Sequence, residues 1–486
     1  MSAQENNPAA DLRIESHVWK VAGVVILGMI MSILDTTIVN VALPTLSKDL
    51  HAPISQVQWV VTGYLLALAA VIPVSGWAAR RFGARQVYMW ALVFFTLGSA
   101  LCATATSVQE LVLFRILQGI GGGMIMPVGQ LIMAQVAGPK RMGRVMGIVA
   151  MPAMLGPILG PILGGVILQN LHWSWIFLVN VPVGLIALPL CWKMLPHTHA
   201  GEAGKLDITG LVLMSGGATS LVYGLSEAGT HASLTAPSVI WPTIAGLVLI
   251  GVFVLHALRI DRPLLDVRLY KNRIFSAASL TTFALGASLF GAMILVPLYY
   301  QDVRGFSVVE TGLLNGPQGL GALIMMPIGG RLMGRFGGGR VALVGLVLVT
   351  LATLPLCYIG LNTSVAWLSV VLFVRGMGIG LSFMPAMSAA FAAMRPDQLS
   401  DATPQLNVLQ RVGGAIGTAA LAVVLTRATG PVHSPDNVIH GFQSAYWVAL
   451  GIAALGIIPC IVLARAERPK DAVVPPPGVA AEVAGA

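Results

Sequence analysis

The chain has 486 residues, of which 56% are apolar and only 10% are charged, and its formal net charge is +9. Soluble domains carry about 25% charged residues, so these charges could not cover the roughly three soluble domains that the length alone would suggest. The composition also excludes a disordered or disulfide-rich chain. It therefore indicates an integral membrane protein.

Fourteen apolar segments are long enough to cross a bilayer, which takes about 20 helical residues. We expect spans at 18–46, 58–78, 86–105, 110–134, 144–168, 175–195, 207–227, 238–258, 274–300, 308–333, 341–361, 366–391, 402–427 and 441–465. These segments lack the alternation of strands, and only helices or closed barrels satisfy the backbone in lipid. The expected fold is an all-α membrane protein with fourteen transmembrane helices, of which the first also replaces a cleavable signal peptide.

The positions of Lys and Arg predict the orientation. With the N-terminus inside, most of the 28 basic residues face the cytoplasm, and the outside receives Lys48, Arg304 and Arg427. The positive-inside rule then predicts a multi-pass protein of the cell's inner (plasma) membrane with both termini cytoplasmic. This topology explains the basic character of the chain, and no nucleic-acid partner is expected.

An internal repeat predicts the domain organisation. Residues 72–87 (IPVSGWAARRFGARQV) match residues 326–341 (MPIGGRLMGRFGGGRV) at a constant offset of 254, and residues 113–123 loosely resemble 372–380. Parallel repeats are typical of transporters with a substrate cavity between two halves. We expect six-helix halves at 18–195 and 270–466, two inserted transmembrane helices at 205–260, a cytoplasmic N-terminal tail at 1–17 and a disordered cytoplasmic tail at 467–486.

Asp35 is the only acidic residue deep within an apolar segment. A charge at the membrane centre costs several kcal/mol, so such a residue is a functional candidate. Because burial disfavours an ionised carboxyl group, Asp35 is expected to gain and lose a proton near neutral pH. Arg115, in the fourth segment, is its expected partner, and Gln118 is expected to share their network. The alternatives are a hydrogen-bonded packing role for Asp35 and a purely structural role for Arg115.

A substrate cavity should draw polar side chains from both halves, although each could instead form local hydrogen bonds within its helix. The candidates are Tyr64, Gln118, Asn315, Gln318, Asn407, Gln410 and Arg411. The sequence shows no phosphate-binding loop with its lysine, no metal-ligand spacing and no catalytic constellation. We therefore expect no cofactor, no metal and no enzymatic activity.

Five motifs carry a resemblance to a known family. They are LDTTIVNVALP (34–44), GWAARRFGARQ (76–86), LVLFRILQGIGGG (111–123), GPILGPILGG (156–165) and WSWIFLVNVPVG (173–184). With them the chain resembles the major facilitator superfamily, and in particular its fourteen-helix drug:proton antiporters of the EmrB/QacA type. The resemblance implies alternating access, and the fourth of these motifs favours antiport over import.

The resemblance also points to residues of conformational gating, in the loop after the second helix and in the fifth helix. They are Gly76, Arg81, Gly83, Arg85, Gly156, Pro157, Gly160, Pro161, Gly164 and Gly165. The family's loop motif carries an acid where this chain has Arg80, and the second copy has Gly334 there. The contact that stabilises the outward-open state must therefore be weaker or built otherwise. Arg81 and Arg85 are expected to pair with helix C-terminal carbonyls or only to obey the positive-inside rule.

We predict a proton-coupled antiporter that exports amphipathic or lipophilic small molecules, with Asp35 as the proton carrier. A dedicated exporter of one metabolite or antibiotic and a non-transporting membrane sensor remain alternatives. The expected partners are small-molecule substrates, protons and the lipid bilayer. The sequence leaves open whether a periplasmic adaptor protein joins the transporter in a host with an outer membrane.

Overall fold

The computed structural model describes residues 15–149, 151–196, 204–231, 233–429 and 435–467. Within these ranges all regular secondary structure is helical, in agreement with the expected fold class. Most of the two expected tails, residues 1–14 and 468–486, lies outside the described residues.

The first part of the chain forms eight helices. They are α1 (Ser16–Asp49), α2 (Ile54–Val71), α3 (Ser75–Phe82), α4 (Ala84–Thr104), α5 (Val108–Val149), α6 (Met151–Asn170), α7 (Trp175–Leu178) and α8 (Asn180–Met194). A 3₁₀ turn, η1 (Ile72–Val74), joins α2 to α3. Gly138 breaks α5 with a φ of 67°, so the fifth expected span corresponds to the end of α5 together with α6.

The second part of the chain forms another eight helices. They are α9 (Ile208–His231), α10 (Pro237–Arg259), α11 (Arg273–Leu298), α12 (Val308–Phe336), α13 (Gly338–Thr353), α14 (Val365–Ala392), α15 (Leu399–Thr429) and α16 (Pro435–Ala466). Short segments flank them, namely the 3₁₀ turns η2 (Val267–Lys271), η4 (Leu354–Tyr358) and η5 (Pro396–Gln398) and the π-helical turn η3 (Tyr299–Val303).

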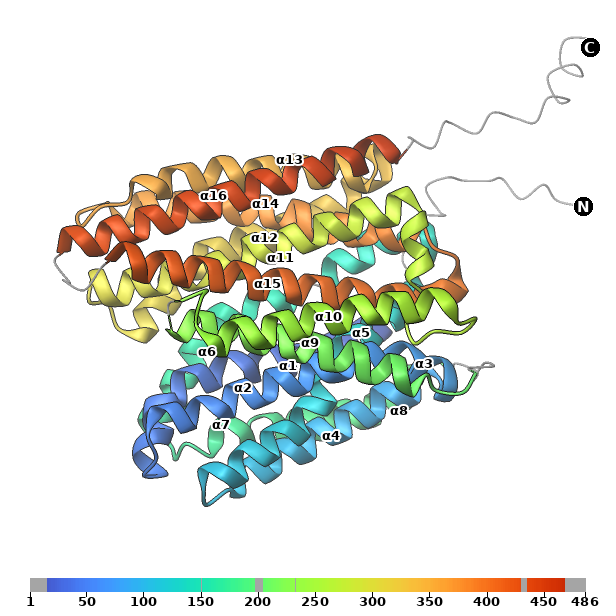
Figure 1. Ribbon diagram of the computed structural model, residues 1–486, viewed down its shortest axis with the longest axis horizontal. Helices are drawn as coiled ribbons and strands as arrows, with labels where there is room; N and C mark the ends of the chain where they lie inside the picture. The colour runs from blue at the N-terminus through green and yellow to red at the C-terminus, as the bar shows by residue number, and fades with distance from the viewer. Residues whose placement is uncertain (1–14, 150, 197–203, 232, 430–434, 468–486) are drawn as a thin grey trace, which may run out of the picture.

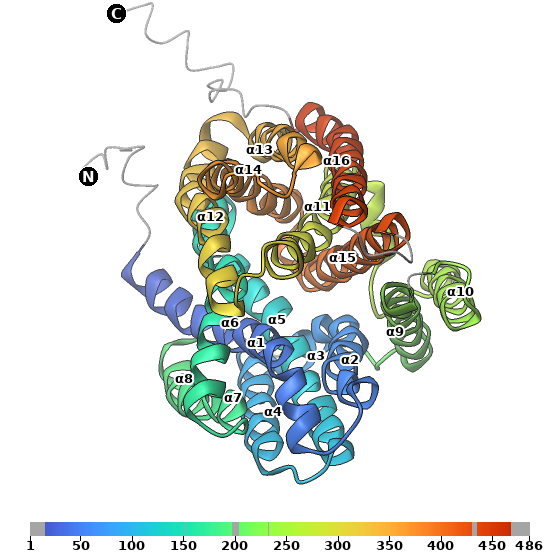
Figure 2. The same ribbon diagram turned by 90° about the vertical axis from the view of Figure 1, so that its left-hand side faces the viewer.

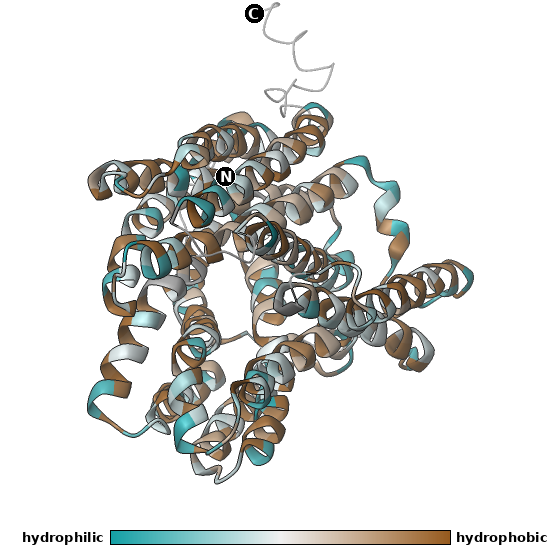
Figure 3. Ribbon diagram, turned by 60° about the vertical axis from the view of Figure 1, so that its left-hand side comes forward, coloured by the Kyte–Doolittle hydropathy of each residue, from teal (hydrophilic) through white to brown (hydrophobic). Residues whose placement is uncertain are grey.

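Twelve helices among the described residues are long and apolar enough to cross a membrane, so the expected count of fourteen is not reached. The two expected spans that are missing correspond to α6, whose described apolar part is short, and to α12. The apolar run of α12 is interrupted by Asn315, Pro317 and Gln318. Figure 3 shows hydrophobic residues along the lengths of the helices and hydrophilic ones mainly at their ends and connections, the distribution expected of a membrane-spanning bundle.

The helices lie side by side along the long axis of the molecule (Figure 1). Viewed along this axis, α1 to α8 gather on one side and α11 to α16 on the other, with α5 and α6 near the middle (Figure 2). The pair α9 and α10 lies at the flank, where α9 contacts both α2 and α15. The end of the bundle that holds α3 and the last turn of α16 is called the α3 end below.

Glycines place equivalent helices of the two sides in the same register. Three glycines of α5, spaced two residues apart, bring this helix against the backbones of α2 and α4. Three glycines of α14 with the same spacing bring it against α12 and α13. The nearest carbonyl oxygens belong to Tyr64 at Gly119, Ala91 at Gly121, Leu68 at Gly123, Gln318 at Gly376, Gly345 at Gly378 and Ala322 at Gly380. Residues 64, 68 and 91 map onto 318, 322 and 345 at the offset of 254 seen in the loop repeat. The same contacts align α5 with α14 so that Arg375 stands where Gln118 stands.

Candidate proton-coupling site and gating contacts

Asp35 of α1 and Arg115 of α5 form an ion pair at the centre of the first side. Nη1 of Arg115 lies 2.5 Å from Oδ2 of Asp35, and both side chains are completely buried. Both residues belong to apolar helices, so their charged groups lie inside the bundle and away from water. A pair in such surroundings is held by mutual attraction and by hydrogen bonds, since neither charge is solvated.

Two amide side chains complete the coordination of the Asp35 carboxylate. Gln118 donates from Nε2 to Oδ1 of Asp35 at 2.8 Å, and Asn180 of α8 donates from Nδ2 to the same oxygen at 3.0 Å. Both amides also donate to the Ser99 hydroxyl oxygen of α4, at 2.6 and 3.2 Å. Four helices therefore contribute to one buried polar network whose single carboxylate has both oxygens bonded.

The Arg115 guanidinium is held on several sides. Nε donates to the carbonyl oxygen of Val60 at 3.1 Å, and Nη1 also donates to Oε1 of Gln118 at 2.6 Å. The Tyr64 ring lies 4.0 Å from the guanidinium carbon, a cation–π contact, whereas Nη2 has no hydrogen-bond partner among the described residues. Neutralising Asp35 would leave this cation uncompensated in a dry site, at a cost of about 3–5 kcal/mol. Protonation must therefore be accompanied by a rearrangement around Arg115.

Water does not reach Asp35 in this conformation, because its exposed fraction is 0%. On α1, Ser32 on the α3 side of Asp35 and Thr36 and Thr37 on the other side are all half-buried, and Asn40, farther from the α3 end, is exposed.

Polar contacts join the two sides at the α3 end. Nη1 of Arg80 lies 2.7 Å from Oδ1 of Asp401 and donates to the Ser400 hydroxyl at 2.9 Å. Deeper in, Asn407 of α15 donates to Oε1 of Gln130 of α5 at 2.8 Å. Arg80 occupies the loop position where the family motif has an acid, and its partner is an acid in the first turn of α15. The charges of this contact are thus the reverse of those that the motif would supply.

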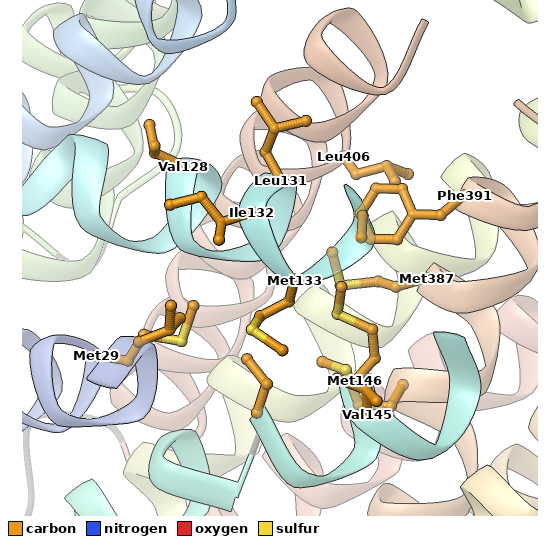
Figure 4. Packing of buried hydrophobic residues seen from close by; sticks show 14 of the residues in the cluster. Met29, Val128, Leu131, Ile132, Met133, Val145, Met146, Met387, Phe391 and Leu406 are labelled. Atoms are coloured by element: carbon orange, nitrogen blue, oxygen red, sulfur yellow. The ribbon is translucent and has the colours of Figure 1, made fainter. Parts of the chain in front are cut away.

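An apolar interface lies beside these polar contacts. Figure 4 shows Met133 and Met146 of α5 close to Met387 and Phe391 of α14, with Leu406 of α15 nearby. All five belong to one buried cluster that draws on both sides of the molecule. Together with the Arg80–Asp401 pair, it closes the α3 end between the two sides.

The loop glycines allow the close approach. Gly76 faces the backbone carbonyl of Ser400, which leaves no room for a Cβ atom. Gly83 ends α3 with a φ of 88°, a conformation that favours glycine. Arg85 is buried and donates to the carbonyl oxygen of Trp192 in the last turn of α8, whereas Arg81 is exposed.

The glycines of the fifth-helix motif form a close seam with α1. Cβ atoms at Gly156, Gly160 and Gly164 would meet Ile33, Thr37 and Ile38, so this face of α6 packs within its own side. Gly165 instead faces Val309 of α12 on the other side. Pro161 is half-buried in α6, and the side chain of Pro157 lies outside the described residues.

The predicted cavity residues fall into two groups. Tyr64, Gln118, Asn407 and Gln410 are buried, and the first three already have the polar or cation–π contacts given above. The other three predicted residues, on α12 and α15, are half-buried: Asn315, Gln318 and Arg411. Gln318 accepts a hydrogen bond from Arg375 at 2.8 Å.

Sequence reasoning missed four partners of these sites: Ser99, Gln130, Asn180 and Asp401. Asn180 lies inside the motif WSWIFLVNVPVG (173–184). A polar amide within this apolar run could have indicated a buried polar contact. Ser99 carries no comparable signal, because small polar residues are common in membrane helices. Asp401 is 321 positions from Arg80, so only the fold brings them together.

Comparisons with known proteins identify the family. A model described as Major Facilitator Superfamily matches residues 25–418. The chain is 42% identical over 418 residues to a Multidrug resistance protein B homolog of Mycobacterium tuberculosis, which covers 85% of this chain and 77% of the relative. It is 31% identical over 400 residues to the Multidrug export protein EmrB of Haemophilus influenzae, with 81% and 78% covered.

A solved structure shares the fold. The crystal structure of the human organic anion transporter MFSD10 matches with a TM-score of 0.64 over 91% of this chain and 99% of that chain, at 18% identity. The sequence and structure matches together define a multi-pass membrane transporter. The chain belongs to the major facilitator superfamily and, within it, to the EmrB/QacA type that its motifs resemble.

Proposed function

We propose that this chain is a proton-coupled antiporter that exports amphipathic or lipophilic small molecules, that is, a multidrug efflux transporter. The observation that carries the proposal is the buried network of Asp35, Arg115, Gln118 and Asn180, whose only titratable acid is held beside a fixed cation. The names of the relatives, multidrug resistance protein B homolog and multidrug export protein EmrB, support the class of substrate.

The proposed coupling depends on whether Asp35 is ionised and paired with Arg115 or protonated and released from it. In the conformation described here, Asp35 is ionised and neutralises Arg115, and the α3 end is closed. A proton that enters from the opposite end releases Arg115 from Asp35, and the unpaired cation then drives a rearrangement. Opening of the α3 end lets the proton leave and a substrate enter. Each elementary charge that moves inward across 100 mV supplies about 2.3 kcal/mol.

We further propose that the α3 end faces the cytoplasm, as the positive-inside rule predicts. This orientation places both chain ends on the cytoplasmic side and requires an even number of crossings. The 29 residues of α12 extend about 43 Å at 1.5 Å per residue, enough to span in spite of its polar residues. With α6 continuing the helix that follows Gly138, this gives fourteen crossings, in two six-helix halves (18–195 and 270–466) flanked by α9 and α10.

The proposal is tested by substrate-driven proton movement in inside-out vesicles that contain the wild type or Asp35→Asn. A panel of ethidium, rhodamine 6G and other lipophilic dyes should release protons from wild-type vesicles and none from Asp35→Asn vesicles. The matched control is Asp302→Asn, which removes an exposed acid of η3, the turn that follows α11, and should leave proton release intact. Equal proton release by Asp35→Asn and wild type would remove Asp35 from the mechanism. No release by the wild type with any dye would overturn multidrug antiport.

A further inference from the structure

A deep groove runs along the outer surface of the bundle between α11 and α16, with Ile416 of α15 also in its wall. Its volume is about 1330 Å³. Small residues open it: Gly456 lies against Ala284, and Ala277 and Ala287 continue the α11 wall. It lies away from the Asp35 network, none of whose residues lines it.

The walls of the groove are apolar over most of its length. Leu280 and Phe283 of α11 face Leu455, Ile458 and Val462 of α16 across it. Several of these side chains are largely exposed, for example Leu455 at 67% and Ile458 at 62%. An apolar surface of this size on a membrane transporter is covered by acyl chains.

One end of the groove is basic. Arg273 begins α11 and Arg465 lies in the last turn of α16, so both stand at the α3 end. Both are exposed, and within the described part of the chain no carboxylate lies within 4.0 Å of either guanidinium. The side chains of Tyr270 and Asn272 line the same end. Two cations with free donors therefore stand above an apolar channel.

The length of the groove matches one leaflet of a bilayer. From Arg273 to Ala287, α11 rises about 21 Å, and from Ile452 to Arg465, α16 rises about 20 Å, at 1.5 Å per residue. Half of a bilayer that is about 40–45 Å thick with its headgroups is about 20–22 Å. The basic end thus stands at headgroup depth when the apolar end reaches the midplane.

We propose that this groove binds an anionic phospholipid of the cytoplasmic leaflet. The phosphate group sits between Arg273 and Arg465, and the acyl chains lie along Leu280, Phe283 and Leu455. The choice of leaflet rests on the proposed orientation, under which the α3 end faces the cytoplasm, where anionic lipids concentrate.

The test uses the purified full chain in mixed micelles with a photoactivatable phosphatidylglycerol that carries its reactive group in an acyl chain. Mass spectrometry should find labelled peptides from residues 273–287 and 452–466. The double variant Arg273→Gln/Arg465→Gln should bind this lipid about 30-fold more weakly, as two charges near an anionic surface predict. The control Arg331→Gln/Arg335→Gln removes two exposed arginines of α12 at the same end and should label like the wild type.

A matched phosphatidylcholine probe distinguishes recognition of the headgroup from occupation of the groove by acyl chains alone. At equal concentration, this probe should label the groove far less than phosphatidylglycerol does. Equal labelling by the two lipids, or undiminished labelling of the Arg273→Gln/Arg465→Gln variant, would overturn the proposal. Soluble glycerophosphate in excess should not compete, because it lacks the chains that the groove holds, and competition would reassign the site to free phosphate. The assay involves no transport, so its result is independent of the proton-coupling experiment.

Discussion

The centres of the two sides hold the same kind of cation in opposite electrostatic situations. Arg115 is paired with Asp35. Arg375 occupies the position in the second half that is equivalent to Gln118 in the first. It is 1% exposed and has no carboxylate within 4.0 Å among the described residues. It donates to Oε1 of Gln318 at 2.8 Å and to the Ser288 carbonyl at 3.4 Å, and its Nε has no partner.

Carried on to α1 and α11, the offset of 254 seen at the loop repeat pairs Asp35 with Leu289, which lines a small cavity beside Arg375. Because α5 and α14 align at an offset of 257, this pairing is a prediction that the variants below test. This cavity of about 10 Å³ has room for about one water. Under this alignment an apolar residue of the second half occupies the position of the carboxylate in the first. Under the proposed coupling, proton chemistry belongs to the half that holds Asp35, while the other half carries a cation without an acidic partner among the described residues.

The largest expected effect contrasts Arg115→Met with Arg375→Met. Removal of Arg115 leaves Asp35 buried and unpaired and should destabilise the protein by about 3–5 kcal/mol. Removal of Arg375 deletes a buried cation that lacks a counter-ion, so stability should change little or rise. Unfolding of each variant in the same detergent measures both effects. Equal destabilisation by the two substitutions would contradict the asymmetry of the halves.

A second prediction installs the missing acid. Leu289→Asp should be tolerated in the presence of Arg375, because it restores the arrangement of the first half. The same substitution in an Arg375→Met background should destabilise strongly, since the new carboxyl group then has no cation. A double-mutant cycle should give a coupling of about 1–3 kcal/mol. Additive effects would show that residues 289 and 375 do not face each other.

A smaller effect is expected at the Arg80–Asp401 pair, whose side chains are 27% and 18% exposed. Asp401→Arg alone places two cations together and should open the α3 end, so that a cysteine introduced at Asn407 reacts faster with a water-soluble maleimide. The exchanged pair Arg80→Asp/Asp401→Arg should return reactivity toward the wild-type rate. Failure of the exchange to restore it would assign the contact to packing instead of charge.

The smallest effect is expected outside both halves, at the start of the inserted pair. Asp207 accepts hydrogen bonds from Gly210, Leu264 and His256, the last at 2.9 Å. Burial raises the pKa of Asp207, but these hydrogen bonds outweigh it and hold the pKa below its usual range. The ionised form therefore stabilises the fold above the unfolded-state pKa of about 3.9, and this stability is lost as the pH falls through the folded-state pKa. Asp207→Asn keeps one acceptor oxygen, so it should cost about 1–2 kcal/mol near neutral pH, measured by unfolding. Proton coupling should be unchanged, and its loss would extend the site to the inserted helices.

Sequence and structure agree where a signal is local. Asp35 and Arg115 stand out because charges are rare in apolar runs, and helix bounds follow from the lengths of those runs, as for α10 (predicted 238–258, observed Pro237–Arg259). The contacts that join separate helices were out of reach, because Asn180 and Asp401 acquire partners only through packing. The loose similarity between residues 113–123 and 372–380 did not predict that Arg375 is equivalent to Gln118. That alignment follows only from the glycine contacts of α5 and α14.

The most direct measurement follows the protonation of Asp35 itself, by infrared difference spectroscopy of the carboxyl band during a pH titration with and without a bound dye substrate. If Asp35 carries the coupled proton, a band of the protonated carboxylic acid should appear as the pH is lowered, respond to the dye and be absent from Asp35→Asn. A carboxylate that stays ionised over the whole titration, with dye and without it, would contradict proton coupling through Asp35.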